Sequence, residues 1–579
     1  MQRSISSFLA AYACSMLYVA PVRSASSVAG GFERASHSRR CFMIKLRPCF
    51  VGVTSTLLLS GLAQAQVQNW STGGANSRQN GLVSVDGPDT PNVLWQGGEF
   101  SYIAYQPFIE GRRLFTVRQN DWVFNIQPGN LNPTDSPIIA MNLDTGAELW
   151  RVNLPFDQIE DVPPDPELDD FLFPRSWLPE VNNDWTTWIF GVSNGRLYAS
   201  RSGNGGRVAS PLYCIDSATG AILWSTAGTG PGDPLRSTIH ASTWSGGLFA
   251  PNGDPIVVCP TYIDRYDAQT GARLWRTRRV ANVWEYGGGA INGNAVYVAD
   301  LVGASNRVKR FNLSTGAFEY QGPPMIGGNL ENAPFIGLDG SIYVPRAQNG
   351  DFENDKLYCF TDNGTAITEK WNIQAHGGGA AARWGVGPDG SIYSMSWSGT
   401  PINQVTFGQL QRLNPDTGAI LNESTTVLRA AWMQIHMAID QRGVVYVSNG
   451  HQGGPSFFPD TGKLYSFNAD LTQRWVVETP GSLHQGGPAL GTDGTLVLVG
   501  TENDIWAYRT APTPAGCDDI DFNNNDVFPE DQDVVDFFNV LAGADCPACN
   551  DIDFNNNGVF PEDQDVIDFL NVLAGGNCP

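Results

Sequence analysis

The sequence predicts an all-β fold built from short strands and tight turns. Of its 579 residues 64 are glycine and 17 are tryptophan, and only 16% are charged, which favours strands over long helices. An eleven-residue pattern also recurs, with Thr, Gly and Trp at identical spacing. Its clearest copies run from Ala140 to Trp150, from Cys214 to Trp224 and from Arg265 to Trp275. One structural unit is therefore repeated along the chain.

Each repeated unit is expected to contain four strands. A copy of the pattern predicts a strand, a turn whose Gly can take a positive φ, and a second strand that ends in an aromatic residue. Another hairpin signal precedes most copies, as in the run from Leu338 to Tyr343. Copies lie about 45–55 residues apart after a longer first interval, which is the period of propeller blades. Weaker copies run from Arg310 to Tyr320, Cys359 to Trp371, Arg412 to Asn422 and Ser466 to Trp475.

The number of units predicts how the ring closes. Counting third strands gives eight units, whereas counting fourth strands gives eight only if the segment from Asn92 to Trp95 is included. The sequence therefore predicts an eight-bladed β-propeller whose last blade takes its outer strand from the N-terminal part of the chain. Such an exchange removes the open edge between the first and last blades.

The eleven-residue pattern resembles the tryptophan-docking motif of the pyrroloquinoline-quinone (PQQ) repeat family, over about residues 66–510. The resemblance implies structural Trp residues packed between blades. For the family's dehydrogenases it also implies adjacent cysteines, a ring-stacking Trp and a catalytic Asp beside calcium. No adjacent cysteines occur in the sequence, and no Asp matches the catalytic position. PQQ is therefore not expected as a cofactor, and the same fold also serves non-catalytic outer-membrane assembly lipoproteins.

Two features of the propeller are candidates for function. The acidic, proline-rich stretch from Phe156 to Asp170 is expected to form a loop on one face. Four histidines fall at or just before the innermost strands of different blades, and they could ring a central channel that takes a ligand. Either they bind a transition metal or they are polar residues that line the channel, and their differing offsets favour the second reading. These histidines are His240, His376, His436 and His484.

The N-terminal residues predict export. A basic stretch and an apolar run follow Met43, the preferred start, and Ala63 and Ala65 form a small-residue cleavage site. Residues 1–65 are thus expected to be a leader with a signal peptide, which places the protein in the periplasm, outside the cell or at its surface. No transmembrane segment is expected, because no run of 18 apolar residues occurs later.

The net charge of −23 is concentrated at the C-terminus. After a linker at residues 511–516, residues 517–579 contain fifteen Asp or Glu and no Lys or Arg. A nucleic-acid partner is therefore not expected, because an acidic tail is repelled by phosphates. Binding of cations is the natural alternative for this tail.

The tail repeats itself with a period of 32 residues, from Asp519 to Asp533 and again from Asp551 to Asp565. Each copy alternates Asp and Asn as a calcium loop does, and the pattern resembles a dockerin or EF-hand loop. Two positions depart from that pattern, because Gln564 replaces the expected acid and Asp526 replaces a Gly. The predicted calcium ligands are Asp521, Asn523, Asn525, Val527 and Asp533 in the first loop, and Asp553, Asn555, Asn557, Val559 and Asp565 in the second.

A helix is expected after each loop, with an apolar face through Val534, Phe538 and Leu541, and through Val566, Leu570 and Leu573. The tail cysteines bracket the repeats as Cys517 with Cys546 and Cys549 with Cys578, and they predict two disulfides of open connectivity. Cys214, Cys259 and Cys359 are expected to be buried thiols. The alternative to a calcium module is an acidic, disulfide-held module without metal.

Three hypotheses for function follow. The preferred one is an exported, non-catalytic propeller that binds or scaffolds, and whose dockerin-like tail attaches it to a protein partner such as a cohesin-like domain or a cell-surface component. The second is a PQQ-dependent dehydrogenase, and the third is a propeller enzyme that acts on polysaccharide. The sequence alone does not assign an activity.

Overall fold

The computed structural model describes the propeller strands and most of the tail. The expected leader and most of the acidic stretch from Phe156 to Asp170 lie outside the described residues. The described residues are 70–101, 106–120, 135–155, 160–161, 186–202, 208–209, 211–226, 247–258, 262–279, 288–302, 305–326, 333–346, 355–375, 384–396, 398–402, 405–431, 436–449, 462–479, 486–501, 505–510, 516–525, 527, 530–556, 559–576 and 578.

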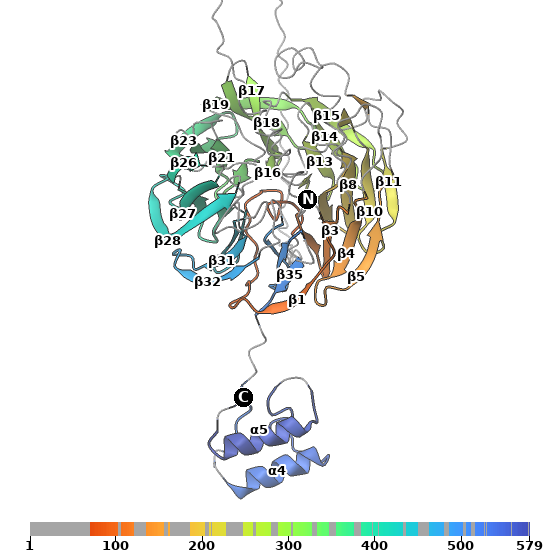
Figure 1. Cartoon of the computed structure of the whole chain (residues 1–579), viewed down its shortest axis with the longest axis vertical. Helices are drawn as coiled ribbons and strands as arrows, with labels where there is room; N and C mark the ends of the chain where they lie inside the picture. The colour runs from red at the N-terminus through yellow and green to blue at the C-terminus, as the bar shows by residue number, and fades with distance from the viewer. Residues whose placement is uncertain are drawn as a thin grey trace, which may run out of the picture. The chain divides into compact units, whose positions relative to one another are not determined.

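Eight antiparallel sheets stand in a ring, which confirms the eight-bladed propeller (Figure 1). In each blade the first strand lies near the axis and the last lies at the rim. Blades 1 to 4 are β2(Phe108–Glu110), β3(Arg113–Val117), β4(Ile138–Asn142) and β5(Glu148–Val152); β7(Thr186–Ser193), β8(Arg196–Ser202), β10(Leu212–Asp216) and β11(Ile222–Ser225); β12(Leu248–Phe249), β13(Pro255–Val258), β14(Tyr262–Tyr266) and β15(Arg273–Arg278); and β16(Ala290–Asn292), β17(Ala295–Val302), β18(Ser305–Asn312) and β19(Phe318–Met325).

The remaining blades follow the same order, with one extra strand in blade 6. Blades 5 to 8 are β20(Phe335–Ile336), β21(Ile342–Arg346), β22(Lys356–Asp362) and β23(Ile367–Gln374); β24(Gly385–Val386), β25(Ile392–Met395), β27(Val405–Leu413) and β28(Ile420–Ala431), with β26(Ser398–Ile402) also on β27; β29(His436–Ile439), β30(Val445–Ser448), β31(Lys463–Phe467) and β32(Gln473–Glu478); and β33(Ala489–Leu490), β34(Leu496–Val499), β35(Ile505–Tyr508) and β1(Val93–Gly97). A separate pair joins β6(Glu160–Asp161) to β9(Val208–Ala209).

The predicted closure of the ring is confirmed. Strand β1 pairs antiparallel with β35, with Val93 opposite Tyr508 and Gln96 opposite Trp506. The N-terminal strand thus forms the outer edge of blade 8, beside blade 1. No free edge remains between the first and last blades.

The repeated Trp docks one blade onto the next at five of the junctions. The Trp224 Nε1–H donates to the Ala268 carbonyl of the following blade at 3.0 Å. A Cβ on Gly271 would lie 2.5 Å from the Trp224 ring, so this turn requires a glycine, and its φ is +72°. The same indole-to-carbonyl bond joins Trp95 to Leu143, Trp150 to Ser217, Trp275 to Leu313 and Trp371 to Pro415.

The Asp and Thr of the repeated motif hold the turn in place. Oδ1 of Asp267 accepts hydrogen bonds from the Gln269 N–H and from both the N–H and the hydroxyl of Thr270. The bond from the Thr270 hydroxyl is the main reason that the pKa of Asp267 lies below its usual range. The Asp, Thr and Gly of the repeat therefore fix the turn on which the neighbouring Trp packs.

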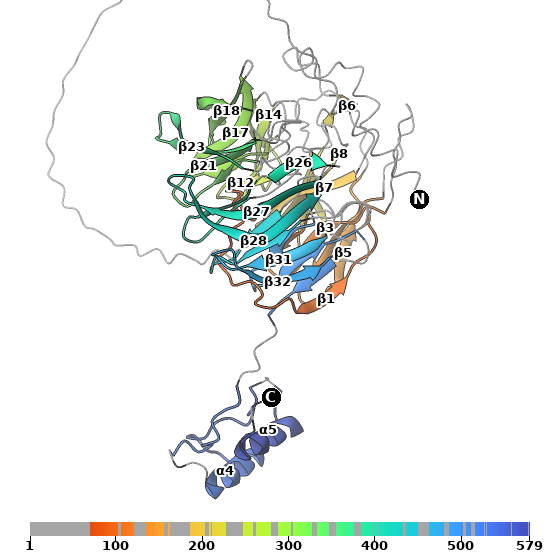
Figure 2. The same cartoon turned by 60° about the vertical axis from the view of Figure 1, so that its left-hand side comes forward.

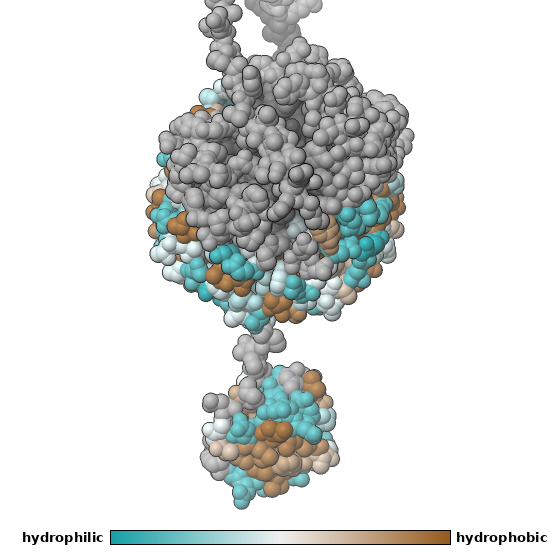
Figure 3. Space-filling model, viewed as in Figure 1, coloured by the Kyte–Doolittle hydropathy of each residue, from teal (hydrophilic) through white to brown (hydrophobic). Residues whose placement is uncertain are grey.

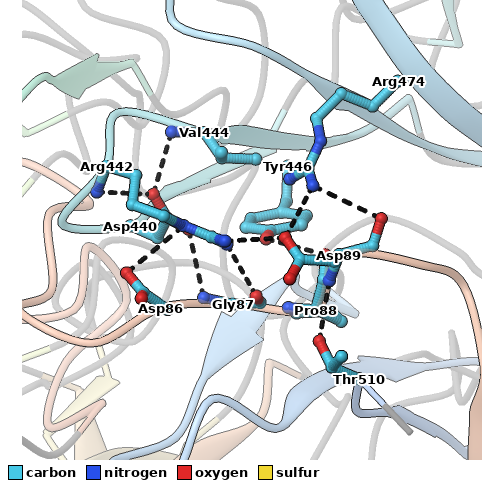
Figure 4. A network of polar contacts seen from close by, with 10 residues as sticks. All are labelled: Asp86, Gly87, Pro88, Asp89, Asp440, Arg442, Val444, Tyr446, Arg474 and Thr510. Carbon is cyan, nitrogen blue, oxygen red and sulfur yellow. Dashed lines mark hydrogen bonds and ion pairs between the residues drawn. The ribbon is translucent and has the colours of Figure 1, made fainter. Parts of the chain in front are cut away.

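Blade 8 lacks this turn because its outer strand arrives from the N-terminus. The Nε1 of Trp475 is buried and has no hydrogen-bond partner within the described residues. Residues 86–89, which we call the clamp, instead hold blade 7 beside this junction (Figure 4). Arg474 bonds Asp89 at 2.7 Å, and the Asp89 N–H donates to the Thr510 hydroxyl at 2.8 Å.

The clamp contacts the fully buried carboxylate of Asp440, which follows β29 of blade 7. It accepts hydrogen bonds from the Gly87 N–H at 3.1 Å and from the Arg442 guanidinium at 2.7 Å. Arg442 also reaches Asp86, Asp89 and the Gly87 carbonyl. Blade 7 and the N-terminal segment are therefore joined through one ionic network.

We expect Asp440→Ala to destabilise the protein by about 2–3 kcal/mol, because it leaves Arg442 and buried N–H groups without their shared acceptor. Chemical denaturation measures the change. Asp416→Ala is the matched control, since Asp416 pairs with Lys370 but is 77% exposed, and its change should stay within about 0.5 kcal/mol. Equal effects for the two variants would contradict the clamp.

The clamp should also give the fold an acid-sensitive part. The hydrogen bond from Arg474 is the main cause that lowers the pKa of Asp89. Because the folded pKa lies below the unfolded value of about 4, this stabilisation is present above that pH and is lost as the pH falls through the folded pKa. Asp89→Asn should flatten this acid limb in melting temperatures measured from pH 3 to 7.

The tail holds two helices that lie side by side in both views (Figures 1 and 2). They are α4(Asp531–Leu541) and α5(Asp563–Leu573). The predicted apolar face was partly wrong, because Phe538 and Leu570 are 41% and 43% exposed whereas Phe537 and Phe569 are fully buried. The buried rings stack with centroids 4.1 Å apart. Both sets of residues fit a helical period, and only the packing of the two repeats decides between them.

Candidate functional site

Residues 70–85, which we call the plug, run across one end of the ring of innermost strands. They form backbone hydrogen bonds with the innermost strands of successive blades, and Figure 1 shows them crossing the middle of the ring. Trp70, at the start of the plug, is 1% exposed. The bonds run from Ile109 to Trp70, Val192 to Ser71, Phe249 to the Ser77 hydroxyl, Ile291 to Ser77, Ile336 to Arg78, Val386 to Asn80 and Ile439 to Gly81.

The plug thus binds the innermost strands of seven of the eight blades. The bonded residues lie near the turn that joins each first strand to its second, so the plug runs across that end of the ring. His240, His376 and His484, which were expected to ring a channel, lie outside the described residues. His436 begins β29 and is buried.

The propeller cysteines do not form a reactive pair. Cys214 lies in β10 of blade 2 and Cys359 in β22 of blade 5, and both are buried free thiols, as predicted. Burial raises the pKa of each thiol to about 12, so neither is a ready nucleophile. Cys259 lies outside the described residues.

The second tail loop brings two of its predicted ligands, Asn555 and Asp565, into contact. The Asn555 N–H donates to Oδ1 of Asp565 at 3.5 Å, and its side-chain amide donates to Asp568 at 2.9 Å. Asp565 is fully buried, and Asp553, Asn555 and Asp568 are each less than 10% exposed. Val559 is 57% exposed, and Asn557 lies outside the described residues.

The first loop has the same arrangement. The Asn523 N–H donates to Asp533 at 3.4 Å, and the Asn525 N–H donates to Asp521 at 3.1 Å. The Asn523 side-chain amide donates to Asp536 at 3.1 Å. Val527 is 56% exposed.

Two pairs of acids at these loops were missed in the sequence. Asp536 and Asp568 lie one turn into each helix, and their spacing from the loops differs from that of an EF-hand. Glu530 and Glu562 are the N-cap residues, and the side chains of Asp533 and Asp565 accept from their backbone N–H groups. The invariant repeat of Glu-Asp-Gln-Asp was the available signal for a helix cap.

The second loop concentrates buried negative charge. Desolvation is the main cause that raises the pKa of Asp565, and the charges of Asp553 and Glu562 raise it further. No Lys or Arg occurs between residues 517 and 579. A cation among these oxygens would relieve the repulsion.

Within the described residues, no group of three His, Cys, Asp and Glu side chains lies close enough to hold a metal. Calcium would therefore need amide and backbone oxygens as well. Asn555 could supply one by turning its amide oxygen, in place of its nitrogen, toward the centre of the loop.

Two disulfides hold the tail, as predicted, and they join Cys517 to Cys578 and Cys546 to Cys549. The cysteines that bracket each repeat are thus not partners of one another. Disulfides fit an oxidising compartment outside the cytosol. Among the described helices, none has the length and apolar character to cross a membrane.

Comparisons with known proteins agree with this architecture. The PQQ_2 family model, described as "Outer membrane protein assembly factor BamB", matches residues 134–317. The quinohemoprotein alcohol dehydrogenase ADH IIB of Pseudomonas putida is 26% identical over 141 residues, which are 24% of this chain and 17% of that enzyme. Residues 134–317 of this β-propeller are therefore similar to the PQQ-repeat family. This family includes both the assembly factor and dehydrogenases.

Solved structures of such proteins were also matched. The quinohemoprotein alcohol dehydrogenase from Comamonas testosteroni is 14% identical, with 84% of this chain and 86% of that chain covered and a TM-score of 0.44. BamB from Moraxella catarrhalis is also 14% identical, with 62% and 77% covered and a TM-score of 0.34. The propeller is established by the order of its own sheets rather than by these scores.

Proposed function

We propose that this protein is an exported, non-catalytic propeller that binds or scaffolds other molecules and is attached through its calcium-binding tail. The observation that carries the proposal is the plug, which accepts hydrogen bonds from the innermost strands of seven blades. A ring whose blades are fastened in this way is suited to serve as a rigid platform for binding. The match to a model described as an assembly factor supports the same role.

A dehydrogenase remains the second candidate because of the match to ADH IIB. Three observations support the non-catalytic role over it. The chain has no adjacent cysteines, its described free thiols lie in different blades, and the match covers only 17% of that enzyme.

For the tail we propose two calcium sites, each built on the oxygens of one loop and of the helix that follows. Buried carboxylates without basic neighbours support this proposal, and so do the alternating Asp and Asn residues of each loop. Asp536 and Asp568 are the added candidates for the ligand sets. A bound calcium ion would supply only charge neutralisation and rigidity.

We expect Asp553→Ala to weaken one of two calcium sites at least about tenfold, because it removes a charged ligand. Calorimetric titration of the full chain measures both sites. Asp545→Ala removes the same charge from an exposed position between the repeats and should leave both affinities within about twofold. Two unaltered sites in Asp553→Ala would reject the ligand assignment.

The exposed face of the tail is the proposed attachment surface. Val535 and Phe538 on α4, and Ile567 and Leu570 on α5, occupy equivalent positions and are 41–55% exposed. Figure 3 shows apolar surface over this module. Exposed apolar patches of this kind mark sites that bind proteins, here a cohesin-like domain or a cell-surface component.

Attachment is tested in cells that produce the protein. With calcium present, the full chain should sediment with the cell envelope, and a chelator should release it. Phe538→Ser combined with Leu570→Ser should appear in the medium while its propeller melts normally. Equal retention of a chain that lacks residues 511–579 would contradict attachment through the tail.

A further inference from the structure

The first tail loop is braced by a segment of the second repeat. The side-chain amide of Asn524 donates to the Ala548 carbonyl at 2.8 Å and to Oδ1 of Asn550 at 3.0 Å. The Asn550 N–H donates in turn to the Phe522 carbonyl at 2.9 Å. We call residues 548–550 the first brace.

The second loop is braced in an equivalent way, 32 residues later. The side-chain amide of Asn556 donates to the Gly516 carbonyl at 3.2 Å and to Oδ1 of Asp518 at 2.8 Å. The Asp518 N–H donates to the Phe554 carbonyl at 2.8 Å. We call residues 516–518 the second brace. Each loop thus depends on the segment that precedes the other repeat.

The two braces differ in how the chain holds them. The first brace is joined to the end of α4 by the short segment 542–547, and the Cys546–Cys549 disulfide beside it spans a sequence separation of only 3. The second brace stands at the start of the module, and the Cys517–Cys578 disulfide joins it to the segment after α5, across a sequence separation of 61. The Cys517–Cys578 disulfide therefore connects the second brace to the segment after α5, as the peptide chain connects the first brace to α4.

We propose that the Cys517–Cys578 disulfide is a redox latch that controls the calcium affinity of the second loop. The inference rests on the proposed calcium function of the tail. Fixing the second brace removes the entropy of closing a long loop, whereas the Cys546–Cys549 bond closes a loop that the backbone already keeps short. The tail then reaches full calcium affinity only in an oxidising compartment.

The switching step is a thiol–disulfide exchange with a dithiol. The dithiol supplies two electrons and two protons, the sulfur–sulfur bond between Cys517 and Cys578 breaks to give two thiols, and the dithiol becomes a disulfide. Release of the second brace removes the hydrogen-bond partners of the Asn556 side chain. The backbone of Asn556 lies in the left-handed region of the second loop, with a φ of +51°. The first loop keeps its brace because the short segment 542–547 still joins that brace to α4.

The test is a calcium titration of three full-length chains under oxidising conditions. The wild type should bind two ions. Cys517→Ser with Cys578→Ser should keep one site and weaken the other about tenfold or more, whereas Cys546→Ser with Cys549→Ser should keep both within about twofold. Dithiothreitol added to the wild type should reproduce the Cys517/Cys578 variant.

The outcomes separate this inference from the calcium proposal. Two sites in the wild type with equal affinities in all three chains would overturn the latch and leave the calcium proposal intact. Equal weakening in both double variants would also overturn it. An oxidised wild type that binds no calcium would reject both.

Amide hydrogen exchange in the full chain gives a readout that does not depend on calcium. On reduction, the Asp518 amide should lose protection while the Asn550 amide keeps it. Asn556→Ala should weaken the second site with the disulfide intact, and Asn524→Ala should weaken the first. Unchanged protection of the Asp518 amide after reduction would contradict the latch.

Discussion

Deleting residues 66–97 is expected to destabilise the propeller by more than about 5 kcal/mol and to broaden its melting transition. The deletion removes the closure strand β1, the clamp and the plug together. Trp70 and Val83 leave the core, and buried side chains of this size contribute about 1.5–3 kcal/mol each. The backbone N–H groups of seven innermost strands also lose their acceptors. Thermal and urea denaturation followed by circular dichroism measure the effect.

A synthetic peptide of residues 66–97 provides the control for this deletion. If the ring is closed by specific pairing, the peptide added in trans should restore much of the lost stability in a concentration-dependent way. A deleted chain that melts cooperatively at the wild-type temperature would contradict both the blade count and the role of the plug.

Trp224→Ala is expected to cost about 3–5 kcal/mol, because it removes a large side chain that packs between blades 2 and 3. The Ala268 carbonyl would also lose its donor. Leu223→Ala is the matched control, since its side chain is 46% exposed one residue earlier, and its cost should be near 0.5 kcal/mol. Unchanged stability in Trp224→Ala, together with loss of ligand binding, would show a functional role for this Trp instead.

A double-mutant cycle tests whether the Trp and the glycine act as a pair. Gly271→Ala should be destabilising because its Cβ would meet the Trp224 ring and because its φ is +72°. Part of that cost should disappear in the Trp224→Ala background, where the ring is absent. Strict additivity would contradict the packing of the glycine against the indole.

The repeat made the ring predictable, whereas the plug and the clamp were not. Each blade carries its own turn and Trp signals, so the number of blades and the strand from Asn92 to Trp95 follow from counting. The plug binds mainly through its backbone, and residues 70–85 carry no periodic pattern that could reveal such contacts. The clamp depends on Arg442 and Asp440 meeting residues more than 300 positions earlier.

The candidate site in the tail was predicted in part. Alternating Asp and Asn gave the loop positions, and the structure brings Asn555 to Asp565 as expected. Asp568 was missed because it belongs to the helix and joins the loop only through the Asn555 side chain. The pairing of Cys517 with Cys578 was open because the spacing of cysteines does not reveal which ends meet in the fold.

The non-catalytic role of the propeller is tested most directly by titrating the full chain with PQQ in the presence of calcium. Absorption spectra report quinone uptake, and a dye-linked assay with primary alcohols reports oxidation. We predict no stoichiometric uptake and no alcohol-dependent reduction of the dye above a protein-free control. Uptake of one quinone per chain together with alcohol-dependent dye reduction would contradict the proposed function and establish a dehydrogenase.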